Sequence, residues 1–278
     1  MIVVTGASGH LGRLVVEELT KRVPAAQVVA AARTPQKAAD LGVEVREADY
    51  DRPETIEAAV RRAARVLLIS GVEPQRARQH TAVVDAAKRA GAVLVYTSAP
   101  KADTTEAALA ADHRATEEYI KASGVTYTIL RNNWYNEVYD PAIAAAPQLG
   151  AVYGASGDGR VASASRADYA AAAAAVLTGE GHDGQVYELA GDTAWSRADL
   201  AAEISKVTGK EVVYRDLPKD EYAGVLAGTG VPAPFAEILA DVDVNVSRDW
   251  LADTPGTLRE LIGRPTRTIG DHVRSLLA

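Results

Sequence analysis

Three glycines at regular spacing, Gly6, Gly9 and Gly12, follow a short apolar run at residues 2–5 and precede leucines and valines at helical spacing. Glycine costs conformational entropy on folding, so a regular set marks a backbone that turns tightly or that another group approaches closely. Between a strand and a helix, G-x-x-G-x-x-G is typical of a dinucleotide site, with pyrophosphate resting on the helix N-terminus. A turn without a ligand is the alternative, but the elements on both sides of it favour binding.

Strand-like and helical patterns alternate through the first half of the chain. Apolar runs of strand length lie at residues 2–5, 28–32, 43–48, 66–70, 93–98 and 127–130. Among the helices between them, one begins near Pro35 and one after Asp51, which with Glu54 forms a potential capping box. Short connections predict a parallel sheet with right-handed crossovers and helices on both faces. The expected fold class is α/β, a Rossmann-type doubly wound parallel sheet.

The pattern loosens after Arg131, where prolines and the turn GASGDGR divide the chain into shorter pieces. We therefore expect a smaller C-terminal substrate lobe over the carboxyl edge of the sheet. The predicted division gives residues 1–131 and a returning segment at about 163–190 to the dinucleotide-binding domain, and residues 132–162 and 191–278 to the smaller lobe.

The charge and residue content argue against several classes of protein. A net charge of −7 disfavours nucleic acid or an anionic membrane as the main partner. No run of about 18 apolar residues is present, and the chain has no cysteine, which excludes disulfides and thiolate chemistry. The five histidines include no H-x-x-x-H pair, so no metal site is expected. We expect a cytoplasmic protein.

The end of the second predicted strand indicates which dinucleotide binds. An NAD site usually has an acidic residue there, for the ribose 2′-hydroxyl. This chain instead reads AAARTPQK, with Arg33 in that place and Thr34 and Lys37 as potential helpers. A guanidinium suits a 2′-phosphate, so we predict NADP(H); a solvated surface arginine is the alternative.

Other polar residues follow the predicted strands, at the edge where open α/β sheets bind ligands. Asp49 could accept a hydrogen bond from the adenine amino group or cap the next helix, and both roles are compatible. The predicted cofactor residues are Gly6, Ser8, Gly9, His10, Leu11, Gly12, Arg33, Asp49, Ser70, Gly71, Thr97 and Ser98.

The segments TGASGHLG, YTS at 96–98, RNNWY at 131–135 and GDGRVASASRADYAAAA at 157–174 resemble the NmrA-like branch of the atypical short-chain dehydrogenases. Within it the chain is most similar to the type 2 NAD(P)H:quinone oxidoreductases, with triphenylmethane reductases as a sister group. The resemblance covers almost the whole chain. It implies an NADPH-binding lobe, a small substrate lobe, direct hydride transfer to a quinone without flavin, and a homodimer. It also places Asn132 and Tyr135 near the nicotinamide.

Ordinary short-chain dehydrogenases carry a Tyr-x-x-x-Lys pair that this chain lacks. The corresponding region reads AADHRATEEY, with His113 where related proteins have a lysine, followed by Glu117. Hydride addition to a ketone gives a basic alkoxide, which needs a positioned acid. A quinone gives a delocalised anion and a cationic dye needs no proton, so positioning can be most of the task. His113 is a candidate proton donor or acceptor-orienting residue; a solvated helical histidine is the alternative.

The segment RNNWYNEVY after the sixth strand places Trp134, Tyr135 and Tyr139 close together. Flat rings suit a small planar acceptor, so these are candidate substrate-binding residues, with Tyr135 also a candidate catalytic residue. Trp134 and Tyr139 could instead fill the core between the lobes.

Three functions fit the sequence. The leading hypothesis is an NADPH-dependent quinone reductase without flavin or metal. A related reductase could act on triphenylmethane dyes, imines or activated alkenes. A redox sensor of NmrA type would bind NADP(H) without catalysis and signal to a protein partner.

The substitution Arg33→Asp tests the cofactor assignment. A carboxylate in place of the guanidinium repels a 2′-phosphate, so the KM for NADPH should rise far more than that for NADH. Steady-state kinetics with both cofactors measure the two changes; equal effects would refute the assignment.

Overall fold

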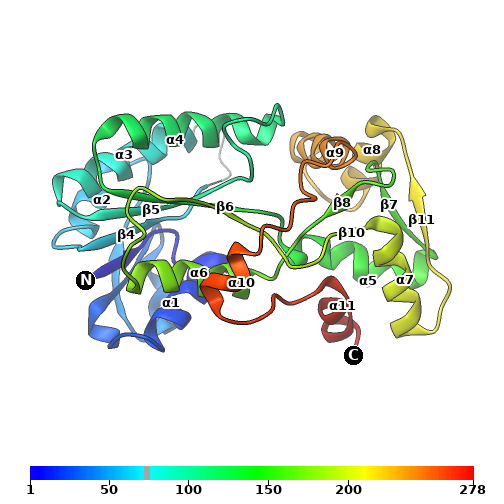
Figure 1. Cartoon of the computed structure of the whole chain (residues 1–278), viewed down its shortest axis with the longest axis horizontal. Helices are drawn as coiled ribbons and strands as arrows, with labels where there is room; N and C mark the ends of the chain where they lie inside the picture. The colour runs from blue at the N-terminus through cyan, green and yellow to red at the C-terminus, as the bar shows by residue number, and fades with distance from the viewer. Residues whose placement is uncertain (72–75) are drawn as a thin grey trace.

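The computed structural model describes residues 1–71 and 76–278. Over these residues it contains a seven-stranded parallel sheet in the order β3-β2-β1-β4-β5-β6-β9, beside a second lobe (Figure 1). The strands of this sheet are β1 (Ile2–Val4), β2 (Val28–Ala32), β3 (Glu44–Glu47), β4 (Arg65–Leu68), β5 (Val93–Ser98), β6 (Tyr127–Asn132) and β9 (Val186–Leu189). The order reverses between β1 and β4, which confirms the predicted doubly wound α/β fold.

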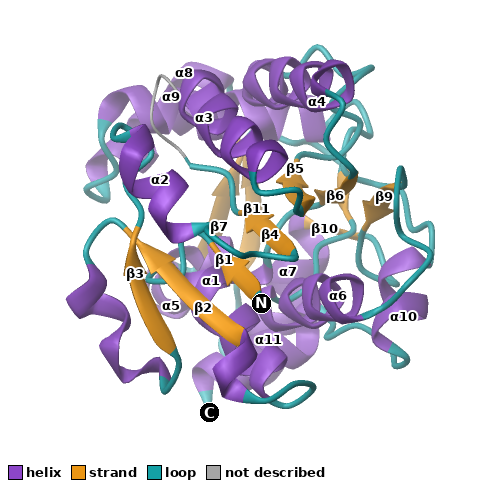
Figure 2. Ribbon diagram, turned by 90° about the vertical axis from the view of Figure 1, so that its left-hand side faces the viewer, coloured by secondary structure: helices purple, strands orange, loops and turns teal. Residues whose placement is uncertain are grey.

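Helices cover both faces of this sheet, as Figure 2 shows. One face carries α1 (His10–Thr20), α6 (Arg166–Thr178) and α10 (Thr257–Ile262); the other carries α2 (Pro53–Ala59), α3 (Arg76–Arg89) and α4 (Ala111–Ser123). Each face has its own apolar core, with Leu19 and Leu177 buried in the first and Ile56 and Ile120 in the second. The short, fully apolar strand β2 is buried throughout, as expected of a parallel strand covered on both sides.

The second lobe lies beyond the carboxyl edge of the sheet (Figure 1). Its elements are α5 (Asp140–Leu149), β7 (Ala151–Gly154), β8 (Arg160–Val161), β10 (Trp195–Ser196), α7 (Arg197–Thr208), β11 (Val213–Asp216), α8 (Lys219–Gly228), α9 (Ala233–Val246) and α11 (Ile269–Leu277). Trp195 and Trp250 are buried in its core. Leu258 of α10, predicted to belong to this lobe, packs instead in the core under the large sheet. The exact division into domains stays a prediction.

The helix predicted to begin near Pro35 is present as a 3₁₀ helix, Pro35–Leu41. One local expectation was wrong. The predicted capping box does not form, because α2 begins one residue later, with Arg52 as N-cap and Pro53 at its first position. Proline is pre-organised for that position and has no N–H to satisfy. The Asp51 carboxylate accepts a hydrogen bond from Gln79 Nε2 instead, at 3.0 Å.

None of the helices within residues 1–71 and 76–278 is both long enough and apolar enough to cross a membrane.

The glycine turn brings α1 directly onto the end of β1. Gly6 has φ +63°, a left-handed conformation that favours glycine. A Cβ at Gly12 would lie 2.7 Å from the Cα of Ala7 and closer still to the carbonyl oxygen of Gly6. Only a residue without a side chain allows this approach, so Gly12 fixes the position of the helix N-terminus.

The substitution Gly12→Ala should therefore lower the free energy of unfolding by about 1–3 kcal/mol, the usual cost of overpacking. Gly224→Ala is the matched control, because Gly224 lies in α8 with nothing within 4 Å of the added Cβ. Alanine there should be neutral or stabilise the helix by up to about 1 kcal/mol. Urea unfolding measures both variants, and equal stability of the two would contradict the close approach at Gly12.

Candidate functional site

A cavity of about 840 Å³ opens at the carboxyl edge of the sheet, between the two lobes. Its volume lies within the usual range for small-molecule and cofactor sites. Every cofactor residue predicted from the sequence lines it: Gly6, Ser8, Gly9, His10, Leu11, Gly12, Arg33, Asp49, Ser70, Gly71, Thr97, Ser98 and Asn132. The sheet topology brings these positions together, because the carboxyl ends of parallel strands share one edge. Their roles in binding stay predictions.

The N-terminus of α1 faces this cavity without a side-chain cap. Its N-cap is Gly9, which makes no side-chain hydrogen bond and cannot make one. The first N–H groups of a helix lack intrahelical partners and carry the positive end of the helix dipole. This end of the cavity therefore suits phosphate.

Two buried side-chain oxygens at the cavity lack hydrogen-bond partners among the described residues. They are Oε1 of Gln79, on α3, and Oδ1 of Asn132, at the end of β6. A buried acceptor without a donor costs free energy, commonly about 1–3 kcal/mol. Both lone acceptors fit a dinucleotide, which carries amino groups at its adenine and its carboxamide. Gln79 is not recognisable as a site residue from the sequence, because nothing in the helical pattern shows that its side chain faces a cavity.

Ser98, at the end of β5, is held by a buried carboxylate. Its hydroxyl donates to Glu117 Oε1 at 2.6 Å. Arg131 also binds Glu117 through two hydrogen bonds of 2.9 and 2.6 Å. Glu117 is therefore fully engaged, and it orients Ser98 rather than acting as a proton donor.

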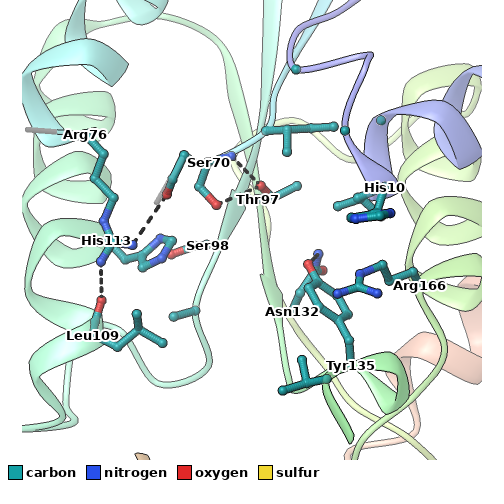
Figure 3. A pocket seen from close by; sticks show the side chains of 18 of the residues that line it. His10, Ser70, Arg76, Thr97, Ser98, Leu109, His113, Asn132, Tyr135 and Arg166 are labelled. Atoms are coloured by element: carbon teal, nitrogen blue, oxygen red, sulfur yellow. Dashed lines mark hydrogen bonds between the residues drawn. The ribbon is translucent and has the colours of Figure 1, made fainter. Parts of the chain in front are cut away.

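His113 reaches the cavity from α4 (Figure 3). It is only 6% exposed, so the alternative of a solvated helical histidine is wrong. Its Nδ1 lies 2.8 Å from the hydroxyl of Tyr96. Burial lowers the pKa of His113 to about 3, with repulsion by Arg76, and by His80 when that ring is protonated, as the smaller causes. The ring is therefore neutral at neutral pH and can donate or accept a hydrogen bond, but it does not act as an imidazolium acid.

Tyr135 and Trp134 also line the cavity. The hydroxyl of Tyr135 lies 3.4 Å from Asn132 Nδ2, and its ring packs edge-on against Tyr169 with a centroid distance of 5.2 Å. Burial raises the pKa of Tyr135, so its hydroxyl stays protonated. The guanidinium of Arg166 lies 5.1 Å from the centre of the Tyr135 ring.

Tyr139 does not belong to the cavity wall, which corrects the prediction that it binds substrate. A 3₁₀ helix, Asn136–Tyr139, turns its side chain into the core of the second lobe. There its ring packs against Trp195 at 4.8 Å, beneath the guanidinium of Arg197. The alternative reading of a core residue holds for Tyr139.

One part of the cavity wall, formed by α9, is not apparent from the sequence. The N-terminal half of α9 lines the cavity with three apolar residues, Phe235, Ile238 and Leu239. Their i, i+3, i+4 spacing signals a helical face, but not what that face covers. Within the described residues, no cluster of histidine, cysteine, aspartate or glutamate could hold a metal ion.

Together the fold and the cavity define a Rossmann-type dinucleotide-binding protein. Residues 6–180 match the model of a family described as NAD(P)H-binding. The chain therefore belongs to this NAD(P)H-binding family.

Individual relatives are more informative than the family match. The chain is 48% identical to quinone oxidoreductase 2 of Escherichia coli strain K12, over 99% of this chain and 98% of the relative. A crystal structure of an NADPH-dependent quinone oxidoreductase from Escherichia coli complexed with NADPH matches with a TM-score of 0.97 and 47% identity. The Citrobacter triphenylmethane reductase complexed with NADP(H) matches with a TM-score of 0.95 and 37% identity. Both structures cover the whole of this chain and are covered in full. The resemblance inferred from the sequence is confirmed, as is the cofactor, NADP(H).

Acid should destabilise the protein through His113. In the unfolded chain this residue has its ordinary pKa, near 6.5, whereas in the folded chain the pKa is about 3. Between these values the unfolded state binds the extra proton, so stability falls as the pH drops below about 6.5. At pH 5 the loss from this residue is on the order of 2 kcal/mol.

The variant His113→Gln removes the titrating group and should flatten the dependence of stability on pH by that amount. Urea unfolding of both proteins at pH 7, 6 and 5 measures the slopes. Parallel slopes would show that His113 is not buried as a neutral ring.

Proposed function

We propose that this protein is an NADPH-dependent reductase that transfers hydride directly to a quinone, without flavin or metal. One observation carries the proposal. The cofactor cavity continues into an apolar, aromatic section, and the position of the usual catalytic pair there holds a neutral His113 and a fully engaged Glu117. The 48% identity to a quinone oxidoreductase over nearly the whole chain supports the same activity.

The acceptor section lies between the two lobes. Its lining includes Trp134, Val138 and Pro141 and, from α9, Phe235 and Ile238. Apolar and aromatic walls bind a flat ring by burying its faces. This lining favours a planar, uncharged quinone over a small polar substrate.

When bound, NADPH supplies the hydride; the chain supplies orientation and hydrogen bonds. Tyr96 can donate its hydroxyl hydrogen to His113 Nδ1, which leaves Nε2–H as the donor on the other side of the ring. The protonated hydroxyl of Tyr135 is a second neutral donor in the cavity. Donors that are held in place before reaction stabilise negative charge as it develops on a carbonyl oxygen. A hydroquinone anion is weakly basic, so water can supply its proton after hydride transfer.

A triphenylmethane dye is the second candidate acceptor. The solved triphenylmethane reductase is 37% identical over the full chain. Hydride transfer to a carbocation needs no proton donor, which also fits a neutral His113. Imines and activated alkenes fit less well, because their reduced forms are more basic and call for an acid. For a sensor that binds NADP(H) without turnover, no residue of the cavity gives specific support.

The proposal also includes the cellular location and the oligomeric state of the protein. We place the protein in the cytoplasm, which its lack of cysteine supports. We also propose a homodimer, on the family resemblance alone.

The decisive experiment offers purified protein NADPH with a panel of acceptors and follows absorbance at the nicotinamide band. The panel contains benzoquinone, naphthoquinone, a cationic triphenylmethane dye, an imine and an activated alkene. We expect oxidation of NADPH with the quinones, and the faster rate with naphthoquinone because its larger flat surface fills the apolar section.

No turnover with either quinone would reject the proposal. Turnover with the dye alone would establish the second candidate. Tight binding of NADPH without turnover of any acceptor would favour the sensor.

A further inference from the structure

Arg166 is a cavity residue for which the predicted site gave no role. It is the first residue of α6 and half-buried, and its side chain lines the cavity. Figure 3 shows the guanidinium reaching toward Asn132, with His10 on one side and Tyr135 on the other. Its position is fixed from two directions, because the guanidinium packs on the Tyr135 ring and the backbone N–H donates to the Glu137 carboxylate at 3.0 Å.

The guanidinium lacks a counter-charge in the part of the chain that the structure describes. No carboxylate lies within ion-pair distance of it there, whereas the cavity arginine Arg76 pairs with Asp112 at 2.9 Å. The Glu137 carboxylate accepts a hydrogen bond from the backbone N–H of Arg166. The guanidinium of Arg166 is therefore the group of this residue that can still bind a ligand. A fixed guanidinium with free donors is suited to bind phosphate.

The location of Arg166 indicates which part of the dinucleotide it would contact. Arg33 and Asp49 lie at the ends of β2 and β3, on the side predicted to hold the adenosine. The glycine turn after β1 lies in the middle, and α6 packs beside α1 on the face that continues toward β6. Arg166 therefore lies beyond the glycine turn, on the side of Asn132 and Tyr135.

We propose that Arg166 binds the phosphate that carries the nicotinamide riboside, opposite the first N–H groups of α1. The helix terminus and the guanidinium would then neutralise the pyrophosphate from two sides. This inference rests on NADPH binding in the cavity and holds whichever acceptor is reduced.

Three nucleotides test it by isothermal titration calorimetry. NADP⁺ has both phosphates and the nicotinamide, 2′-phospho-ADP-ribose has both phosphates without the nicotinamide, and 2′,5′-ADP lacks the second phosphate of the bridge. Arg166→Gln should weaken binding of the first two nucleotides by a similar factor of about ten or more, as expected for loss of a hydrogen bond to a charged group. Binding of 2′,5′-ADP should change by less than about two-fold, which also shows that the variant is folded.

Two further variants sharpen the test. Arg22→Gln removes the same charge from an exposed residue just beyond the C-terminal end of α1 and should leave all three affinities unchanged. Arg166→Lys keeps the charge but loses the planar guanidinium with its paired donors. It should therefore weaken binding of NADP⁺ by less than Arg166→Gln does.

Three other patterns of affinity change would overturn the inference. Equal weakening of all three nucleotides would place the effect at the adenosine side or in the fold. Weakening of NADP⁺ alone would place Arg166 against the nicotinamide ring. Unchanged affinities would leave it a purely structural residue. None of these outcomes depends on turnover, so failure of the quinone assay leaves the inference intact.

Discussion

The approach of α1 to the end of β1 is the constraint on which the rest of the site depends. The missing side chain at Gly12 lets the helix start against Gly6 and Ala7, and Gly9 leaves its first turn without a side-chain cap. Unpaired N–H groups are thereby presented at the carboxyl edge of the sheet. Strand order then places the ends of β2, β4, β5 and β6 around that point. The backbone thus forms an end of the cavity that suits phosphate.

Charge pairs around the buried Arg131 brace the end of β5. Arg131 is 5% exposed and binds Glu117, Asp103 and Glu188, whose carboxylates come from α4, the loop after β5, and β9. Only the Glu117 carboxylate is buried with it, because the side chains of Asp103 and Glu188 are 52% and 38% exposed. Removing one partner of the buried Arg131–Glu117 pair typically costs about 3–5 kcal/mol because the other is left uncompensated. The network holds Ser98 through Glu117 while none of these charges is left unpaired beside the acceptor.

The sequence predicted the parts of this structure that local patterns encode. Strand–helix alternation and the glycine spacing gave the sheet, its helices and the residues at the strand ends, because parallel topology sends all of those ends to one edge. The path of the chain after β6 was not encoded locally. There a 3₁₀ turn points Tyr139 into the core, and only tertiary packing brings α9 and Arg166 to the cavity. Gln79 and Phe235 occupy ordinary helical positions, and nothing in their spacing distinguishes a cavity wall from a packed face.

The cavity has positive groups in its cofactor section and neutral groups near the acceptor section. The positive groups of the cavity include Arg33 and the N-terminus of α1, both of which suit phosphate. Near the acceptor section, burial keeps His113 and Tyr135 neutral. This neutrality matters because a nicotinamide ring gains positive charge as hydride leaves it. A protonated His113 would oppose that charge in a region of low dielectric, where the repulsion is strong. A neutral donor stabilises the anion forming on the acceptor without this penalty, so an acceptor whose reduced form is a weak base is the one this site is built to reduce.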